Sequence, residues 1–240
     1  MSLRRNEIRL GGFHISRRAL KSRLRELLVE RETQAVIEEI LRFPPRRIVN
    51  PLFSFIQSGE PGLKWAAVRC FGALVAKLAD EDSESARIIM RRLMWSLNDE
   101  SGGIGWGSAE AMGEVLACHP GLAGEYVSIL LSYAREDGNY LEHEPLQRGL
   151  LWAIGRVAGR HPHLVRAAVP GLTVYLSSPD AGVRGLAARL MGLLRVSEAC
   201  TRLCALTEDN SEIPIDFQDE LGKQYVKDLV SEALKIIPCT

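Results

Sequence analysis

Four segments of the 240-residue chain align on one glycine, and this repetition limits the possible folds more than any other feature of the sequence. The segments are WAAVRCFGALV at 65–75, WGSAEAMGEVL at 106–116, RGLLWAIGRVA at 148–158 and GLAARLMGLLR at 185–195. Their glycines are Gly72, Gly113, Gly155 and Gly192, spaced by 41, 42 and 37 residues. A fifth, weaker segment at 224–237 places Ser231 in the glycine position.

Within each segment the apolar residues recur at intervals of three and four, which is the spacing of a helix with one buried face. A glycine inside a helix costs about 1 kcal/mol relative to alanine. Glycines at matching positions therefore predict a close approach of a neighbouring helix. A period near 40 leaves room for two helices and two turns in each unit, and sustained alternation of period two is missing.

The sequence thus predicts an all-α fold, an α-α superhelix of about five helix pairs. Second helices are expected at 83–97, 121–134, 163–177 and 197–206. Three further helices are expected ahead of the repeats: one capped by Ser16, one over 32–42 that Pro44 and Pro45 end, and one over 46–58. We therefore divide the chain into N-terminal capping helices at 1–58 and one continuous solenoid at 59–240.

The repeats resemble HEAT repeats, and in particular the short HEAT-like repeats named after phycobilisome lyases. SSPDAGVRGLAARLMGLL at 177–194 and EPGLKWAAVRCFGAL at 60–74 carry the resemblance, each with Val-Arg before the small residues and the glycine. The middle units depart from it, with Glu110 where Arg69 and Arg189 stand. The resemblance implies an interaction scaffold for most members and an enzyme for a few, and it places the second helices on the concave side.

Charge and hydropathy bear on partners and location. Thirty basic residues balance thirty acidic ones, which disfavours nucleic acid as a partner. Residues 1–50 hold twelve basic and six acidic side chains. This surplus fits solvated capping helices, an acidic partner or head-to-tail contact between copies. No apolar stretch of membrane-spanning length and no apolar signal core occurs, and the five cysteines form no CxxC pair, so we expect a cytoplasmic protein with buried, reduced thiols.

Two inter-repeat turns carry the most unusual local sequence. The first lies in WSLNDESGGIGWGSAEAMGE at 95–114, where the lysine of a nucleotide-binding loop is missing and two carboxylates would repel phosphate. The second lies in EDGNYLEHEPLQRGLLW at 136–152 and combines a histidine with carboxylates just before a helix. Corresponding turns of a solenoid stack side by side, which predicts one polar ridge flanked by aromatic residues. The candidate partner-binding residues are Trp95, Asp99, Glu100, Trp106, Tyr140, Glu142, His143, Glu144 and Arg148.

Other interpretations of these residues stay open. Glu144 and Arg148 have the spacing of a surface ion pair on a helix. The cluster from Glu142 to Glu144 would suit a metal or proton transfer if the preceding turn supplied another ligand. We assign no catalytic residue, no metal and no cofactor, because the sequence contains no GxSxG, HExxH or Ser-His-Asp arrangement.

The leading hypothesis is therefore a non-catalytic scaffold that binds a protein or peptide partner through this ridge. The competing class is an enzyme or nucleic-acid-binding protein on a HEAT-like scaffold. One version resembles the DNA alkylation-repair glycosylases, but the 121–134 helix offers no basic residue for phosphate contacts. The other version resembles the bilin lyases, for which the sequence supplies only the type of repeat.

Overall fold

The structure is a computed structural model that describes residues 8–10, 13–30, 33–99, 105–214 and 224–238. It begins with a hairpin in which β1 (Ile8–Leu10) pairs antiparallel with β2 (Phe13–Ile15). The sequence analysis did not expect this hairpin, because strands of three residues are too short to show sustained alternation. The two glycines between the strands are its sequence signal.

Three helices precede the repeats: α1 (Arg17–Glu30), α2 (Thr33–Ile40) and α3 (Pro45–Ile56). The Ser16 hydroxyl accepts a hydrogen bond from the backbone N–H of Ala19, as predicted for a helix cap, at 3.2 Å. Apolar side chains spaced three or four apart, including Leu20, Leu24 and Leu27, are buried. All three helices contact the first glycine-bearing helix.

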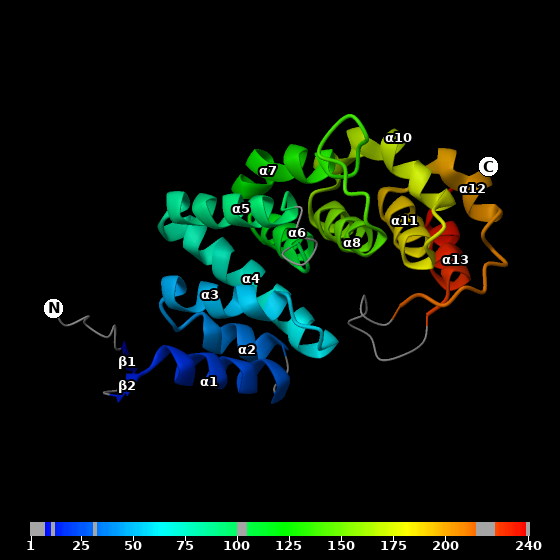
Figure 1. The fold of residues 1–240 in the computed structure, drawn as a ribbon. Helices are drawn as coiled ribbons and strands as arrows, with labels where there is room; N and C mark the ends of the chain where they lie inside the picture. Colours follow the sequence, from blue (N-terminus) through cyan, green and yellow to red (C-terminus); the bar gives the residue numbers. More distant parts are fainter. Residues whose placement is uncertain (1–7, 11–12, 31–32, 100–104, 215–223, 239–240) are drawn as a thin grey trace.

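The glycine-bearing helices form one row, which we call the inner row. Its members are α4 (Pro61–Glu81), α6 (Ser108–Cys118), α8 (Glu144–Arg160), α11 (Ala181–Leu194) and α13 (Val226–Ile236). Each packs against the next, and the row bends into a curved stack (Figure 1). The prediction of an all-α superhelical solenoid is confirmed, with the small hairpin added at its start.

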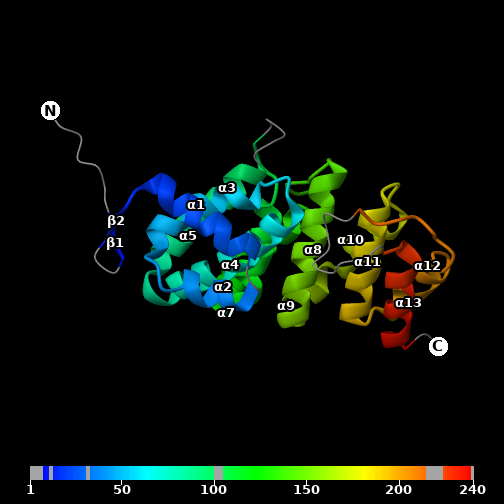
Figure 2. The ribbon, with the colours of Figure 1, turned by 90° about the horizontal axis from the view of Figure 1, so that it is seen from below.

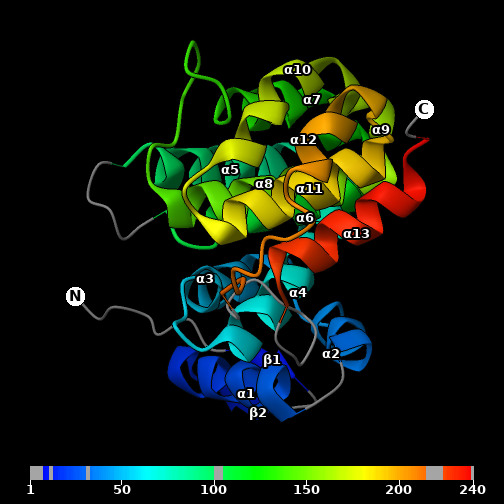
Figure 3. The same ribbon diagram turned by 90° about the vertical axis from the view of Figure 1, so that its right-hand side faces the viewer.

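The second helices form another row, the outer row, which packs along one side of the inner row (Figures 1 and 3). The first two are α5 (Ser83–Leu97) and α7 (Pro120–Ser132). The predicted 163–177 helix is broken into α9 (Pro162–Val165), η1 (Arg166–Ala168), α10 (Val169–Leu172) and η2 (Thr173–Ser177). Pro170, which has no N–H to continue the α-helical bonds, explains the break. The last outer segment is η3 (Ser197–Ala199) followed by α12 (Cys200–Cys204).

The expectation that second helices line the concave side is wrong. Figure 1 shows α5, α7, α10 and α12 along the outer arc, with the glycine-bearing helices beneath them on the inside of the curve. Close backbone approach at glycine shortens the spacing between helices on that side, and the side with the shorter spacing becomes the concave one.

Three of the four repeated glycines pack as predicted. A methyl group added at Gly72 would clash with the Glu114 side chain, and one added at Gly113 would lie 2.8 Å from the Ala153 carbonyl oxygen. At Gly192 it would lie 2.9 Å from Ala233. Gly155 is not packed in this way, because a methyl group added there would meet only a leucine methyl, at 3.9 Å. Ser231 is exposed, so the fifth position takes no part in this packing.

Ion pairs join the first three inner helices to one another. Lys64 of α4 pairs with Glu110 of α6 at 2.7 Å, and both side chains are buried. Glu114, one residue after Gly113, accepts two hydrogen bonds from the Arg156 guanidinium of α8, at 2.6 and 2.8 Å. Glu110 therefore departs from the repeat pattern for a structural reason, since it satisfies a buried lysine.

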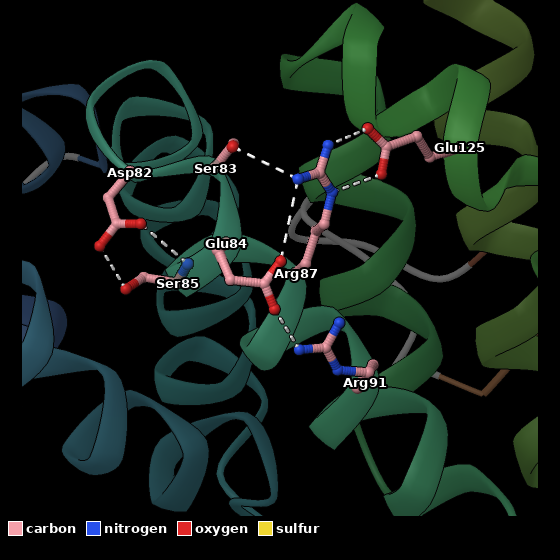
Figure 4. A network of polar contacts seen from close by, with 7 residues as sticks. All are labelled: Asp82, Ser83, Glu84, Ser85, Arg87, Arg91 and Glu125. Carbon is pink, nitrogen blue, oxygen red and sulfur yellow. Dashed lines mark hydrogen bonds and ion pairs between the residues drawn. The ribbon is translucent and has the colours of Figure 1, made fainter.

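The outer row has its own network, which Figure 4 shows around the start of α5. Asp82 caps the helix by accepting from the Ser85 backbone N–H at 3.1 Å. Arg87 donates two hydrogen bonds at 2.8 Å to Glu125 of α7, and Arg91 pairs with Glu84 at 2.6 Å. The hydrogen bonds from Arg87 lower the pKa of the Glu125 carboxyl. These arginines of α5 thus already have carboxylate partners.

Among the described helices, none is both long enough and apolar enough to cross a membrane. The expectation of buried, reduced thiols is confirmed for Cys70 and is wrong for the other described cysteines. Cys70 is buried, and burial raises the pKa of its thiol to about 12. Cys118 and Cys204 are exposed free thiols, whereas Cys200 is disulfide-bonded.

Candidate functional site

The first predicted turn is shaped by glycine at the start of α6. Gly107 caps this helix with a φ of 73°, in the left-handed region that a side chain disfavours. An added Cβ there would also clash with the carbonyl oxygen of Ile56 at the end of α3. This tight packing leaves the neighbouring Trp106 at the surface, with 37% of the residue exposed.

The second turn is held from beneath by Gln147 of α8. Its buried amide donates to the Leu141 carbonyl oxygen at 2.8 Å and to the Tyr140 hydroxyl at 3.1 Å. Leu141 is buried while Tyr140 is 36% exposed. The polar residues that follow, from Glu142 to Glu144, are therefore exposed on an anchored segment.

The structure brings the two turns together. The rings of Trp106 and His143 meet edge to face, with centroids 6.1 Å apart. Gly105 lies beside the last turn of α5, where an added Cβ would be 3.4 Å from the Ser96 carbonyl oxygen. Trp95, which precedes Ser96 on α5, is 65% exposed. We call the surface formed by Trp106, Tyr140, Glu142, His143 and Glu144 the turn ridge. Trp95 is exposed on α5 and Asp99 is half-buried just after it, and their membership of the ridge stays a prediction.

Of the remaining two predicted site residues, the structure places only Arg148, and it lies away from the turn ridge. Glu100 lies outside the described residues. Arg148 is largely buried and forms an ion pair with Asp180, at 2.5 Å, across the step from α8 to α11. The pair with Glu144 suggested by the i,i+4 spacing is therefore replaced by a contact between repeats. Asp180 also caps α11 by accepting from the Val183 backbone N–H at 2.9 Å.

The Asp180 carboxylate predicts a pH-dependent loss of stability. Burial raises its pKa, but hydrogen bonds from Arg148 and Val183 outweigh this effect and hold the pKa below the ordinary value. The stabilisation is therefore complete above the unfolded pKa of about 3.9 and is lost as the pH falls through the folded pKa. We expect Asp180→Asn to lower the urea midpoint at pH 7, and the difference from wild type to shrink below about pH 4.

Asp137→Asn is the control for this prediction, because Asp137 forms an exposed pair with Arg135 within one turn of the chain. Its midpoint should stay near that of the wild type at pH 7. A difference between wild type and Asp180→Asn that stays constant from pH 7 to pH 2 would contradict the assignment.

A hollow beside Trp106 completes the site, and the sequence analysis missed it. It has a volume of about 340 Å³ and is lined by the turn that joins α3 to α4. This turn lies 46 to 49 residues before Trp106, and no motif in it points to the ridge. The lining residues are Ile56, Gln57, Ser58, Gly59, Pro61, Lys64 and Trp106.

Within the described residues, no three histidine, cysteine, aspartate or glutamate side chains come together as a metal-binding group. The electrostatic character of the turn ridge comes from its exposed carboxylates. Nearby cations have other partners, since Lys64 pairs with Glu110 and Arg135 pairs with Asp137. The ridge thus offers aromatic faces beside negative charge.

No protein-family model matches the chain, and no curated protein matches it. Solved structures do resemble it. A designed armadillo repeat protein is 16% identical, with 92% of this chain and 94% of that chain covered and a TM-score of 0.53. An engineered protein is 14% identical, with coverages of 91% and 98% and a TM-score of 0.51. A structure of computationally designed armadillo repeat proteins for modular peptide recognition is 15% identical, with 92% of this chain and 94% of that chain covered and a TM-score of 0.50. At these identities the likeness shows the fold alone, a helical repeat solenoid.

Proposed function

We propose that this protein is a non-catalytic scaffold that binds a cationic peptide segment of a partner protein through the turn ridge. The contact between Trp106 and His143 carries the proposal, because it joins the turns of two successive repeats into one exposed surface. Tryptophan is favoured where interfaces concentrate their binding energy. The designed relatives include proteins made for modular peptide recognition, which supports this use of the architecture.

The chemistry of the ridge favours lysine or arginine in the partner. Glu142 and Glu144 are exposed and acidic, and they flank the His143 ring that contacts Trp106. A cation above an aromatic face gains about 0.5–1 kcal/mol at exposed sites. Carboxylates beside that face add attraction that salt screens. We therefore expect binding that weakens as ionic strength rises.

The repeats themselves we assign to the HEAT-like type. Asp180 of the Pro-Asp turn caps α11 and pairs with the arginine of the preceding repeat, which gives the turn residues a structural role. A nucleic-acid partner is disfavoured, because Arg87 and Arg91 of α5 are held by Glu125 and Glu84. Phosphate contacts from this helix would require those pairs to break.

Peptide titration tests the proposal directly. The probe is a short fluorescein-labelled peptide of alternating lysine, arginine and tyrosine, and its counterpart carries glutamate in place of each basic residue. We expect the cationic peptide to bind, and Trp106→Ala to weaken it by about tenfold, equal to 1.4 kcal/mol. Replacing both Glu142 and Glu144 with glutamine should weaken it comparably. Circular dichroism should show unchanged helicity in all variants.

Matched controls lie on the outer row. Val174→Ala removes an exposed apolar side chain, and Glu198→Gln removes an exposed charge, both away from the turn ridge. Neither should change the affinity. Full affinity for the cationic peptide in the Trp106→Ala and double glutamine variants, or an equal loss of affinity for the acidic counterpart in those variants, would refute the ridge as the binding site.

A further inference from the structure

The step between α8 and α11 is open at the position where the other glycines are packed. A Cβ added at Gly155 would meet only the Leu193 methyl at 3.9 Å, and one added at Gly159, a turn further on, would meet nothing within 4 Å. Glycine inside a helix costs about 1 kcal/mol relative to alanine. At Gly155 no neighbouring helix accounts for that cost, so the space above it needs another explanation.

This space is a groove on the inner row. Figure 2 shows α8 and α11 lying side by side, and the groove runs between them. Its volume is about 150 Å³, comparable to an engineered cavity that admits benzene, so it has room for one aliphatic or aromatic side chain. All of its lining comes from these two helices: Leu151, Trp152, Gly155, Arg156, Gly159, Arg160, Leu186, Arg189, Leu190 and Leu193.

The walls of the groove are apolar at the bottom and positive at the rim. Leu151 and Leu190 are buried, whereas Leu193 is 41% exposed, which is unusual for a leucine beside a packed seam. Arg160 and Arg189 are exposed at the edges, and neither forms an ion pair with a described residue.

A third arginine, Arg156, lines the groove but already has a carboxylate partner. Arg156 is held by Glu114 and lies 5.7 Å from the Trp152 ring centroid. Among the described lining residues none carries a carboxylate. The charges of Arg160 and Arg189 are therefore not balanced by an acidic group among the described lining residues.

We infer that this groove binds an acidic peptide segment of a partner protein, with one apolar side chain of the segment seated over Gly155. Carboxylates on either side of that residue pair with Arg160 and Arg189. Charge complementarity selects the occupant, since Arg160 and Arg189 line the groove without an ion-pair partner among the described residues. The groove lies along the second half of α8, away from the turn ridge at its first residues, and its ligand has the opposite charge. The inference is independent of the proposed function.

A substitution that fills the groove tests whether an apolar side chain of the peptide binds over Gly155. The probe is a fluorescein-labelled peptide with one leucine among glutamates, followed by fluorescence anisotropy. Gly155→Leu places a side chain in the groove, where the structure has room for it. We expect this variant to bind the peptide at least about tenfold more weakly, and to unfold at the same or a higher temperature than wild type.

The matched control is Gly124→Leu on α7 of the outer row, where an added Cβ also meets nothing within 4 Å. It should bind the peptide as the wild type does. Replacing both Arg160 and Arg189 with glutamine should weaken binding comparably, whereas the same change at the exposed Arg18 and Arg166 should not.

Several results would overturn the inference. They are failure of the wild type to bind the peptide, equal affinity of the Gly155→Leu variant, equal affinity for a peptide with serine in place of the leucine, and, in the Trp106→Ala background that weakens the turn ridge, equal affinity for a peptide with lysine in place of each glutamate. The last result would show that the groove does not select negative charge.

Discussion

Glu110→Gln should lower the free energy of unfolding by about 3–5 kcal/mol, the range for removing one partner of a buried ion pair. Lys64 and Glu110 are 9% and 4% exposed in their side chains and lie 2.7 Å apart. The pair is covered by α8, since a Cβ added at Gly149 would lie 2.6 Å from the Glu110 carboxyl carbon. Without the carboxylate, the lysine ammonium stays buried and loses its ion pair with Glu110. Urea unfolding followed by circular dichroism measures the loss.

The effect should depend on Lys64. In a Lys64→Met background the cost of Glu110→Gln should fall sharply, because no buried charge is then left without its partner. Glu125→Gln is the matched surface control, since its pair with Arg87 is exposed and such pairs contribute little. Equal costs for Glu110→Gln with and without the lysine would show that the two side chains are not coupled.

Gly113→Ala and Gly155→Ala should change stability in opposite directions although both glycines occupy the same place in the repeat. At Gly113 an added Cβ would be 2.5 Å from the Ala153 Cα and 2.8 Å from its carbonyl oxygen. Backbone atoms cannot move aside cheaply, so we expect a loss of about 1–3 kcal/mol. At Gly155 the methyl group has room, and alanine should gain about 1 kcal/mol from its higher helix propensity.

Thermal unfolding of the two variants, measured side by side, checks this contrast. A lower melting temperature for Gly113→Ala and a higher one for Gly155→Ala would support the packed and the open step. A loss of stability in both variants would mean that α11 approaches α8 as closely as α8 approaches α6.

Much of the fold follows from the sequence because the repeat fixes both period and register. The limits predicted for the 83–97 helix match α5, since its apolar spacing is regular and Asp82 caps it. The 163–177 helix was predicted without weighing Pro170, which breaks it. Which row lies inside the curve depends on how closely the helix backbones of neighbouring repeats approach one another. The sequence shows where the glycines are, but only the structure shows which neighbouring atoms they contact.

The candidate site was predictable in part. Stacking of corresponding turns correctly places Trp106 beside His143, because the repeat carries both to the same end of the stack. Arg148 was misplaced because helical spacing suggests a local partner, whereas Asp180 lies in the next repeat. The groove over Gly155 could not be predicted, because its glycine has the same sequence context as Gly113 and only the packing of the next helix distinguishes them.

The central claim is that the turn ridge recognises a cationic segment, and NMR mapping of the bound cationic peptide tests it most directly. Backbone and indole N–H signals of the isotope-labelled protein would be followed as the peptide is added. The account predicts shifts that concentrate at the Trp106 indole and at residues 139–144 and fade with added salt. Shifts that concentrate elsewhere, or an unperturbed Trp106 indole at saturating peptide, would contradict it.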